Sequence, residues 1–375
     1  MFFPMEDYIV WFVLMLVLSL LALSAAVYLV ARFHRFSFLT KLGQSHPLLS
    51  WLLALLPLAL LGLFLLFNLT TLIVVLLHVT AGFLIFDLIA FLVRKAGKKT
   101  RYDLYGGAAL LFTLIYLGIG WIMAHHVFET HYRLTTDKAI GEKLRIVEIA
   151  DSHLGITLDG EGFAQQMRRI QTLEPDIVVL VGDFVDDDSK ADDMLAACRA
   201  LGELSRSCGV YFVYGNHDDG YFDYRNFSSA QLREALTENG VHILEDEAVT
   251  VGESLTLVGR RDRSMSGRLD MASLAEDLDP SKYTVLLDHQ PNDYASEAAS
   301  GVDLVLSGHT HGGHIFPAGQ IGLLMRANDR VYGMEERNGT TFIVTSGISG
   351  WAIPFKTGTF SEFVVIDVVG ADRMP

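Results

Sequence analysis

The first third of the chain is built from long apolar segments separated by short polar stretches. Each segment approaches or exceeds the roughly 20 residues that cross a bilayer as a helix, so we expect four transmembrane helices. These segments are Tyr8–Ala31, Pro47–Phe67, Leu69–Val93 and Leu104–Ala124. The first segment lacks a basic leader and is too long for the apolar region of a secretory signal peptide. It is therefore expected to remain as an anchor.

The distribution of basic residues predicts how these helices are oriented. Lys and Arg gather in the loops at residues 32–41 and 94–101, whereas the N-terminus carries only Glu6 and Asp7. Because Lys and Arg concentrate on the cytoplasmic side of membrane proteins, both of these loops are expected there. Both chain termini, and the whole C-terminal domain, are then predicted to lie outside the cytoplasm.

Near residue 125 the pattern changes to short β-branched apolar runs that alternate with amphipathic stretches. Such alternation is typical of βαβ units, in which buried parallel strands read as continuous apolar runs. Five predicted strands are Ile146–Ala150, Asp176–Val181, Val210–Tyr214, Tyr283–Leu287 and Val302–Leu306, and the predicted helices are Gly162–Leu173, Ala191–Ser205 and Ala230–Asn239. Later apolar stretches are expected at Ala248–Val251, Ser254–Val258, Thr341–Thr345 and Phe363–Val368. We therefore divide the chain into a membrane anchor at 1–124, a linker at 125–143 that can add a strand to the sheet, and an α/β domain at 144–375.

Each of the five predicted strands stops at a cluster of Asp, Asn or His. The clusters are Asp151-Ser152-His153, Gly182-Asp183-Phe184-Val185-Asp186, Gly215-Asn216-His217-Asp218, Asp288-His289 and Gly308-His309-Thr310-His311-Gly312-Gly313-His314. Ligands bind outside the carboxyl ends of parallel strands, and imidazole nitrogens suit Zn, Mn or Fe. The ordered set therefore predicts a metal site at that edge of the sheet.

In this order, the five clusters resemble the motifs of the calcineurin-like metallophosphoesterases over about residues 140–370. The Gly-His-Thr-His-Gly-Gly form is similar to the membrane-associated branch that includes UDP-diacylglucosamine hydrolases, although that branch often carries Gln at the position of His314. The resemblance implies a four-layer αββα sandwich of the α/β class, here preceded by an all-α bundle of four transmembrane helices.

The resemblance further implies two divalent metal ions, with Mn, Fe and Zn as the candidates. Asp183 would bridge the ions, and a hydroxide held between them would attack a phosphomonoester or phosphodiester. One ion would be held by Asp151, His153 and His311, and the other by Asn216, His289 and His309. His217 would face the substrate and protonate the leaving oxygen as a general acid. Asp186 would accept a hydrogen bond from His217 and fix its orientation.

Taken singly, these residues have simpler interpretations. Asp151 and Asp183 could each cap a following helix, and an acidic run such as 186–188 is more often a solvated loop. His289 before Gln-Pro could be a turn residue, and Lys356 could be either a phosphate contact or a surface lysine. Within the ordered set, we favour ligation for the Asp and His residues.

Charge separates the two halves of the chain and limits the partners. Residues 144–375 carry a net charge of −19, and residues 1–143 carry +4, which together give the −15 of the whole chain. An acidic domain repels nucleic-acid phosphates, so nucleic acid is not expected as a substrate. Cys198 and Cys208 could pair outside the cytoplasm, although small buried thiols are the favoured interpretation.

The favoured hypothesis is a membrane-anchored, metal-dependent phosphoesterase whose substrate is linked to a lipid or a nucleotide. The alternatives are a catalytically silent sensing or scaffolding protein, and a channel or transporter with a regulatory domain. Transport is disfavoured because His78 and Asp87 lie on roughly opposite faces of one helix, at about 100° per residue, and so cannot form a simple proton relay.

Overall fold

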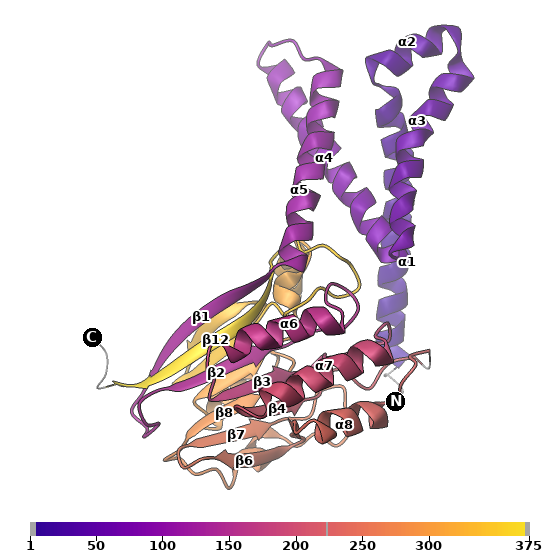
Figure 1. Ribbon diagram of the computed structural model, residues 1–375. Coiled ribbons are helices and arrows are strands. Elements are labelled where there is room, and N and C mark those ends of the chain that lie inside the picture. The colour runs from indigo at the N-terminus through magenta and orange to yellow at the C-terminus, as the bar shows by residue number, and fades with distance from the viewer. Residues whose placement is uncertain (1–4, 223, 372–375) are drawn as a thin grey trace. The chain divides into compact units, whose positions relative to one another are not determined.

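The computed structural model describes residues 5–222 and 224–371 (Figure 1). The chain divides into two compact units, Met1–Ile119 and Gly120–Pro375.

The first unit is entirely helical. Its elements are α1 Met5–His34, α2 Ser37–Ser45, α3 Pro47–Leu61, η1 Gly62–Leu66, α4 Leu69–Lys95 and α5 Tyr102–His125, of which the last enters the second unit. Four stretches are long and apolar enough to cross a membrane: Met15–His34, Pro47–Leu66, Leu69–Lys95 and Tyr102–His125. Each overlaps one of the four segments expected from the sequence. The short helix α2 has nine residues and was not predicted. In the sequence, the loop in which it begins was used only for its basic residues, which predict the membrane orientation.

The two ionisable residues named within the spans have separate local partners. Asp87 accepts a hydrogen bond from the Tyr28 hydroxyl at 2.8 Å and forms an ion pair with Arg32. The His78 ring bonds through Nδ1 to the carbonyl of Val74, one turn earlier, at 2.7 Å. These contacts satisfy both side chains inside the helical unit, as expected for structural rather than transporting groups.

The second unit contains two mixed six-stranded sheets with helices on both sides, and so confirms the predicted αββα class. The first sheet has the order β1-β12-β2-β3-β4-β5, and the second has the order β10-β11-β9-β8-β7-β6. The strands of the first sheet are β1 Val127–Thr136, β2 Leu144–Ile149, β3 Ile177–Val181, β4 Gly209–Val213, β5 His242–Ile243 and β12 Ser361–Gly370. Those of the second are β6 Glu247–Val251, β7 Leu255–Gly259, β8 Tyr283–Leu287, β9 Leu304–Ser307, β10 Gly333–Arg337 and β11 Thr340–Val344.

Three apolar layers hold this unit together. Between the two sheets, inward side chains such as Ile146, Val179 and Val285 form one core. Outside the first sheet, a second core lies under the helices α6 Gly160–Gln171, α7 Ala191–Leu204 and α8 Ser229–Glu238, which cover that face in Figure 1. Outside the second sheet, a smaller core includes the helices α9 Met271–Ala275 and α10 Tyr294–Ala299. Strands covered on both faces explain the unbroken apolar runs of the sequence.

The segment interpreted as a linker contributes a full strand. Residues 127–136 pair in parallel with residues 361–370 along the whole length of both strands, so β1 forms an edge of the first sheet. The two cysteines, Cys198 and Cys208, are free thiols.

Candidate metal centre

The predicted ligands all follow the carboxyl ends of five strands. Strands β2, β3 and β4 run parallel to one another in the first sheet, and β8 and β9 are parallel neighbours in the second. Chain ends of parallel neighbours meet at one sheet edge, and the structure brings the predicted ligands together in two groups. These are Asp151, His153 and His311, and then Asp183, His289 and His309.

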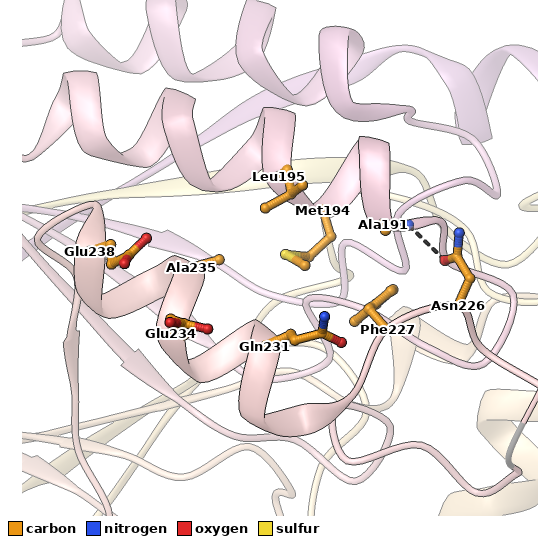
Figure 2. Close-up of a pocket in the computed structure, with 9 residues that line it drawn as sticks. All are labelled: Ala191, Met194, Leu195, Asn226, Phe227, Gln231, Glu234, Ala235 and Glu238. Carbon is orange, nitrogen blue, oxygen red and sulfur yellow. Dashed lines mark hydrogen bonds between the residues drawn. The ribbon is translucent and has the colours of Figure 1, made fainter.

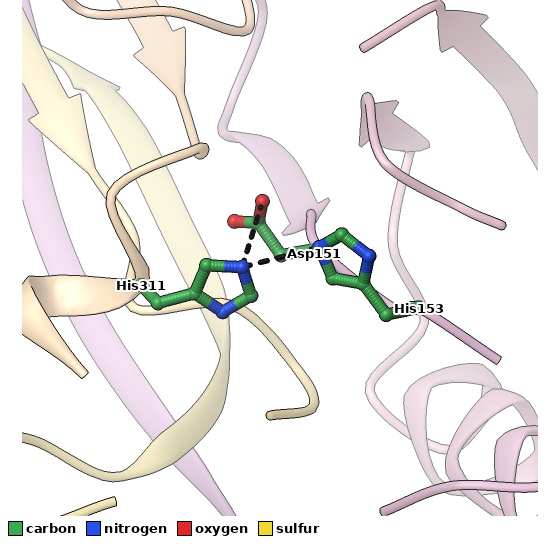
Figure 3. A group of neighbouring side chains, drawn as sticks. All are labelled: Asp151, His153 and His311. Atoms are coloured by element: carbon green, nitrogen blue, oxygen red, sulfur yellow. Dashed lines mark hydrogen bonds and ion pairs between the residues drawn. The ribbon is translucent and has the colours of Figure 1, made fainter. Parts of the chain in front are cut away.

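The first group is shown in Figure 3, where the side chains of Asp151 and His153, from the loop after β2, converge with that of His311, from the turn after β9. His153 Nε2 lies 3.1 Å from His311 Nε2, and His311 Nε2 lies 3.7 Å from Asp151 Oδ1. All three side chains are buried. Two imidazole nitrogens and a carboxylate at such distances can share one cation.

The second group meets the first at Asp183. Asp183 Oδ2 lies 3.1 Å from His289 Nε2 in its own group and 3.6 Å from His153 Nε2 in the other. One carboxylate oxygen therefore stands between the two groups.

Asn216 supplies a further oxygen with an unmet bonding need. Its amide nitrogen donates to the Tyr221 hydroxyl at 2.7 Å, which fixes the orientation of the amide. Its Oδ1 is buried without a hydrogen-bond partner among the described residues, as is His309 Nδ1. Burying such an atom unpaired costs about 1–3 kcal/mol, and ligation of a metal removes that cost. The residues present thus fit a pair of divalent ions held by imidazole, carboxylate and amide groups.

The backbone of the ligand loops is held in an unusual conformation. Asp151, Asp183, His309 and His311 have φ values of 54°, 52°, 69° and 47°. Few residues other than glycine adopt positive φ, and such strain concentrates at functional sites. These four residues turn the chain sharply at the strand ends and direct their side chains to one place.

At two positions the backbone lies so close to a ligand carboxylate that only glycine, which has no Cβ, fits. A Cβ on Gly215 would lie 2.2 Å from Asp183 Oδ1, and one on Gly308 would lie 2.6 Å from Asp151 Oδ2. Neither contact is sterically possible, so the glycine that precedes each ligand motif is needed for space.

Two of the imidazoles are oriented by a partner at the nitrogen facing away from the site. His289 Nδ1 donates to the Val181 carbonyl at 2.8 Å, and His153 Nδ1 lies 3.1 Å from Asp186 Oδ2. Such outer partners fix the tautomer and leave Nε2 free for a metal.

The expected bond between Asp186 and His217 is therefore wrong. The Ser189 hydroxyl donates to the Leu154 carbonyl at 2.7 Å and holds the 186–189 loop beside the chain that follows His153. The Asp186 carboxylate consequently reaches His153 instead.

His217 lies beside the two groups without belonging to either. Its backbone N–H donates to Asp183 Oδ1 at 2.9 Å. Its ring centroid lies 5.1 Å from that of His153 and 5.4 Å from that of Trp351. The ring thus borders the site with Trp351, a residue that no sequence pattern had indicated.

Burial and mutual charge set the protonation of the site. Burial raises the pKa of Asp151 to about 6 and lowers that of His309 to about 4. At Asp183, burial acts to raise the pKa, but the positive charges of His289 and His217 outweigh this effect. The net result is a pKa well below the usual value of an aspartate. Burial lowers the pKa of His217. Neutral imidazole at His309 and ionised carboxylate at Asp183 are the forms that bind metal.

Asp218, the last residue of Gly-Asn-His-Asp, was assigned no role from the sequence. It is fully buried, and its carboxylate accepts four backbone N–H groups. The donors are Asp183 and Gly215 to Oδ2, at 2.9 and 2.7 Å, and Phe184 and Val185 to Oδ1, at 2.8 and 3.1 Å. Asp218 thus fastens two ligand loops to each other.

The simpler interpretations of these residues do not match their contacts. Asp159 caps α6 by accepting from Gly162 N at 2.8 Å, and the N-cap residue of α7 is Lys190. Asp151 instead accepts from His309 N at 3.0 Å, as Asp183 does from His217 N.

Lys356 is neither a phosphate contact nor a surface residue. It is fully buried, and its Nζ donates to the carbonyls of Ser346 and Gly347 at 2.7 and 3.2 Å. Burial lowers its pKa to about 7. It therefore supports the loop that packs against Asp151, since a Cβ on Gly347 would lie 2.6 Å from Asp151 Cβ.

A hollow elsewhere on this unit is separate from these residues. It lies between α7 and α8 and is shown in Figure 2. Its lining includes Met194, Leu195 and Phe227 and none of the predicted metal ligands.

Comparison with known proteins gives consistent similarities. The family profile described as calcineurin-like phosphoesterase matches residues 144–313. A transmembrane protein with metallophosphoesterase domain from Bos taurus is 32% identical over 232 residues, covering 58% of this chain and 51% of that protein. An uncharacterized metallophosphoesterase from Aquifex aeolicus is 33% identical over 247 residues, covering 64% of this chain and 90% of that protein. The match therefore spans about half the length of the bovine relative.

Among solved structures, a dimetal phosphatase from Danio rerio is similar with a TM-score of 0.37 and 12% identity, covering 54% of this chain and 87% of that chain.

Proposed function

Since this chain belongs to the calcineurin-like metallophosphoesterase family, we propose that it hydrolyses a phosphoester at a dinuclear metal centre. We assign Asp151, His153 and His311 to one ion, Asn216, His289 and His309 to the other, and Asp183 to both. The substrate we propose is a phosphomonoester or phosphodiester linked to a lipid or a nucleotide.

The observation that carries this proposal is the position of Asp183 Oδ2. It lies 3.1 Å from an imidazole of one group and 3.6 Å from an imidazole of the other. A carboxylate oxygen in that place can neutralise charge in both groups, which suits two ions roughly 3.5–4 Å apart. A single-metal site would not need both groups.

Each residue then has a defined task. Bound divalent ions would lower the pKa of a water molecule and stabilise charge on the phosphoryl oxygens. Asp186 and the Val181 carbonyl hold His153 and His289 with Nε2 toward the site. His217 borders the site outside both groups, and we assign it to donate a proton or hydrogen bond to the leaving oxygen. Trp351, beside the His217 ring, would limit access of water.

We further propose that the protein spans the membrane four times with the metal centre outside the cytoplasm. The support is the placement of Lys and Arg in the loops at 32–41 and 94–101, because these residues concentrate on the cytoplasmic side. In the test, a single cysteine is placed either in the 94–101 loop or at an exposed position of α7, and intact cells are treated with a membrane-impermeant maleimide. Labelling at α7 alone is expected, and labelling in the loop alone would reverse the orientation.

The hydrolysis proposal is tested with purified full-length protein on mono- and diester substrates after chelation and metal return. Hydrolysis is expected only with metal, and Asp183→Ala is expected to abolish it. Asp188→Ala is the matched control, because Asp188 is an exposed carboxylate five residues away and should leave the rate unchanged. Metal-independent hydrolysis, or full activity of Asp183→Ala, would refute the assignment.

A further inference from the structure

An exposed apolar segment follows the metal-binding turn directly. It runs from Phe316 to Met325, contains the helix α11 Ala318–Leu324, and is called the apolar collar below. Five of its large apolar side chains are exposed: Phe316 by 55%, Ile321 by 50%, Leu323 by 44%, Leu324 by 85% and Met325 by 74%. Elsewhere in the described part of this unit, exposed large apolar side chains occur only singly or in pairs along the chain. Leu195 and Leu269, for example, each occur singly.

The collar is attached to the metal site. It begins two residues after His314, and a Cβ on Gly313 would lie only 2.8 Å from Gly319 Cα, at the start of α11. Phe316 N donates to the Thr357 hydroxyl at 3.2 Å. The backbone N–H groups of Thr357 and Gly358 both donate to the His314 carbonyl at 2.9 Å. The position of the collar is therefore fixed relative to the ligand His311.

The same loop is bonded to the end of an apolar helix that is long enough to cross a membrane. Within the C-terminal unit, Lys356 N donates to the Gly120 carbonyl at 2.9 Å, and the Ser361 hydroxyl donates to the Ala124 carbonyl at 2.8 Å. Gly120 and Ala124 lie in the last turns of α5. Of the three residues between them, Trp121 and Ile122 are also exposed. The exposed apolar residues in the last turns of α5 are thus connected to the collar through one hydrogen-bonded loop.

The composition of the collar favours lipid over water or a polar partner. Exposed apolar patches mark protein or membrane contacts, and interfacial elements bury apolar side chains at the headgroup boundary beside basic residues. Arg326, which is exposed, follows Met325 directly. In a unit of strongly negative charge, this is the arrangement expected of a surface that enters a bilayer.

We propose that the apolar collar, Phe316–Met325, docks into the surface of the lipid bilayer and so presents the metal centre to phosphoesters held in the membrane. The docking follows from the exposed side chains and their attachment to α5. The substrate class, a membrane-embedded phosphoester, rests on the proposed function.

Docking is tested by fluorescence in the full chain, independently of activity. Leu324→Cys is labelled with an environment-sensitive dye in a Cys208→Ser background, because Cys198 is buried. Leu269→Cys, an exposed leucine outside the collar, is the control. In phosphatidylcholine nanodiscs with spin-labelled acyl chains, the dye at position 324 is expected to be quenched and blue-shifted, and the dye at 269 unchanged. No quenching at 324, or equal quenching at both positions, would overturn the proposal.

The consequence for substrate is tested with two esters that share one leaving group, p-nitrophenyl methyl phosphate and p-nitrophenyl hexadecyl phosphate. The triple variant Ile321→Ser, Leu324→Ser, Met325→Ser should lose about tenfold in kcat/KM on the membrane-held hexadecyl ester and nothing on the methyl ester. The control triple variant Leu195→Ser, Leu269→Ser, Met334→Ser should change neither.

Three other outcomes are informative. Equal loss on both esters with a changed oligomeric state by light scattering would make the collar an interface between copies and overturn lipid docking. An unchanged hexadecyl rate would overturn its role in presenting substrate. If the intact protein hydrolyses neither of these diesters nor a phosphomonoester while position 324 is quenched, the docking stands and the phosphoesterase proposal fails.

Discussion

The exchange of Asp218 for Asn tests whether the metal site is held together by one buried carboxylate. Asp218 joins the loop that carries Asp183 to the loop that carries Asn216, through four backbone N–H groups. Asn has nearly the same shape but offers one oxygen in place of two. Its amide nitrogen would face two backbone donors and bond to neither.

The magnitude follows from the bonds lost. Burial raises the pKa of Asp218 to about 7, so the carboxylate is ionised in an assay at pH 9. Hydrogen bonds to a charged group contribute about 1.5–3 kcal/mol each, so losing two costs about 3–6 kcal/mol. For a unit of this size, 1 kcal/mol corresponds to roughly 2–4 °C in Tm. A decrease of roughly 10 °C is therefore expected. Because the two loops carry the proposed ligands Asp183 and Asn216, metal affinity should fall as well.

The assay is thermal unfolding of the purified, chelated full-length protein, followed by a metal titration. Asp219→Asn is the matched control, since Asp219 is adjacent and exposed, and its Tm should stay within about 1 °C. If Asp218→Asn unfolds at the Tm of the unaltered protein and binds metal equally well, the fastening role of Asp218 is refuted.

Three further predictions concern neighbouring groups. Asp186→Asn should weaken metal binding about 10- to 100-fold by releasing His153, and calorimetric titration showing unchanged affinity would contradict this. Burial lowers the folded-state pKa of Lys356 to about 7 from its usual 10.5, so between these values the folded chain binds fewer protons and stability rises with pH by up to about 1.4 kcal/mol per unit. The Tm of the unaltered protein minus that of Lys356→Met should accordingly increase from pH 7 to pH 10. A constant difference would show that Lys356 has the same charge in the folded and the unfolded chain, and would contradict the lowered pKa. Gly215→Ala should abolish binding of the second ion, because the new Cβ would displace the Asp183 carboxylate, and a measured stoichiometry of two ions would disprove that steric argument.

Much of the fold was predictable because its strands are covered on both faces. Such strands leave continuous apolar runs, and Tyr283–Leu287 was predicted with the bounds that β8 has in the structure. The edge strand β10 was missed, since its alternating pattern in Gly333–Arg337 carries no apolar run. The short helices α9, α10 and α11 were missed because five to seven residues are too few to show a period.

The candidate ligands were predictable because each follows a strand end, a position that topology alone brings to one edge. The hydrogen-bond partners that orient these ligand side chains were not predictable. Whether Asp186 bonds His153 or His217 depends on how Ser189 anchors a loop to Leu154, which spacing along the chain does not encode. The burial of Lys356 likewise depends on carbonyls ten residues away in the sequence. Trp351 reaches the site only through the folded path of its loop.

The most direct test of the dinuclear phosphoesterase is one titration in which bound metal and hydrolysis are measured together. Chelated full-length protein receives Mn²⁺ in steps, and bound ion per chain and the rate of diester hydrolysis are recorded at each step. Two ions should bind, with hydrolysis appearing as the second site fills, and Asp183→Ala should lose both the second ion and the rate. Saturation at one ion with full activity, or two bound ions without hydrolysis of any mono- or diester, would contradict the account.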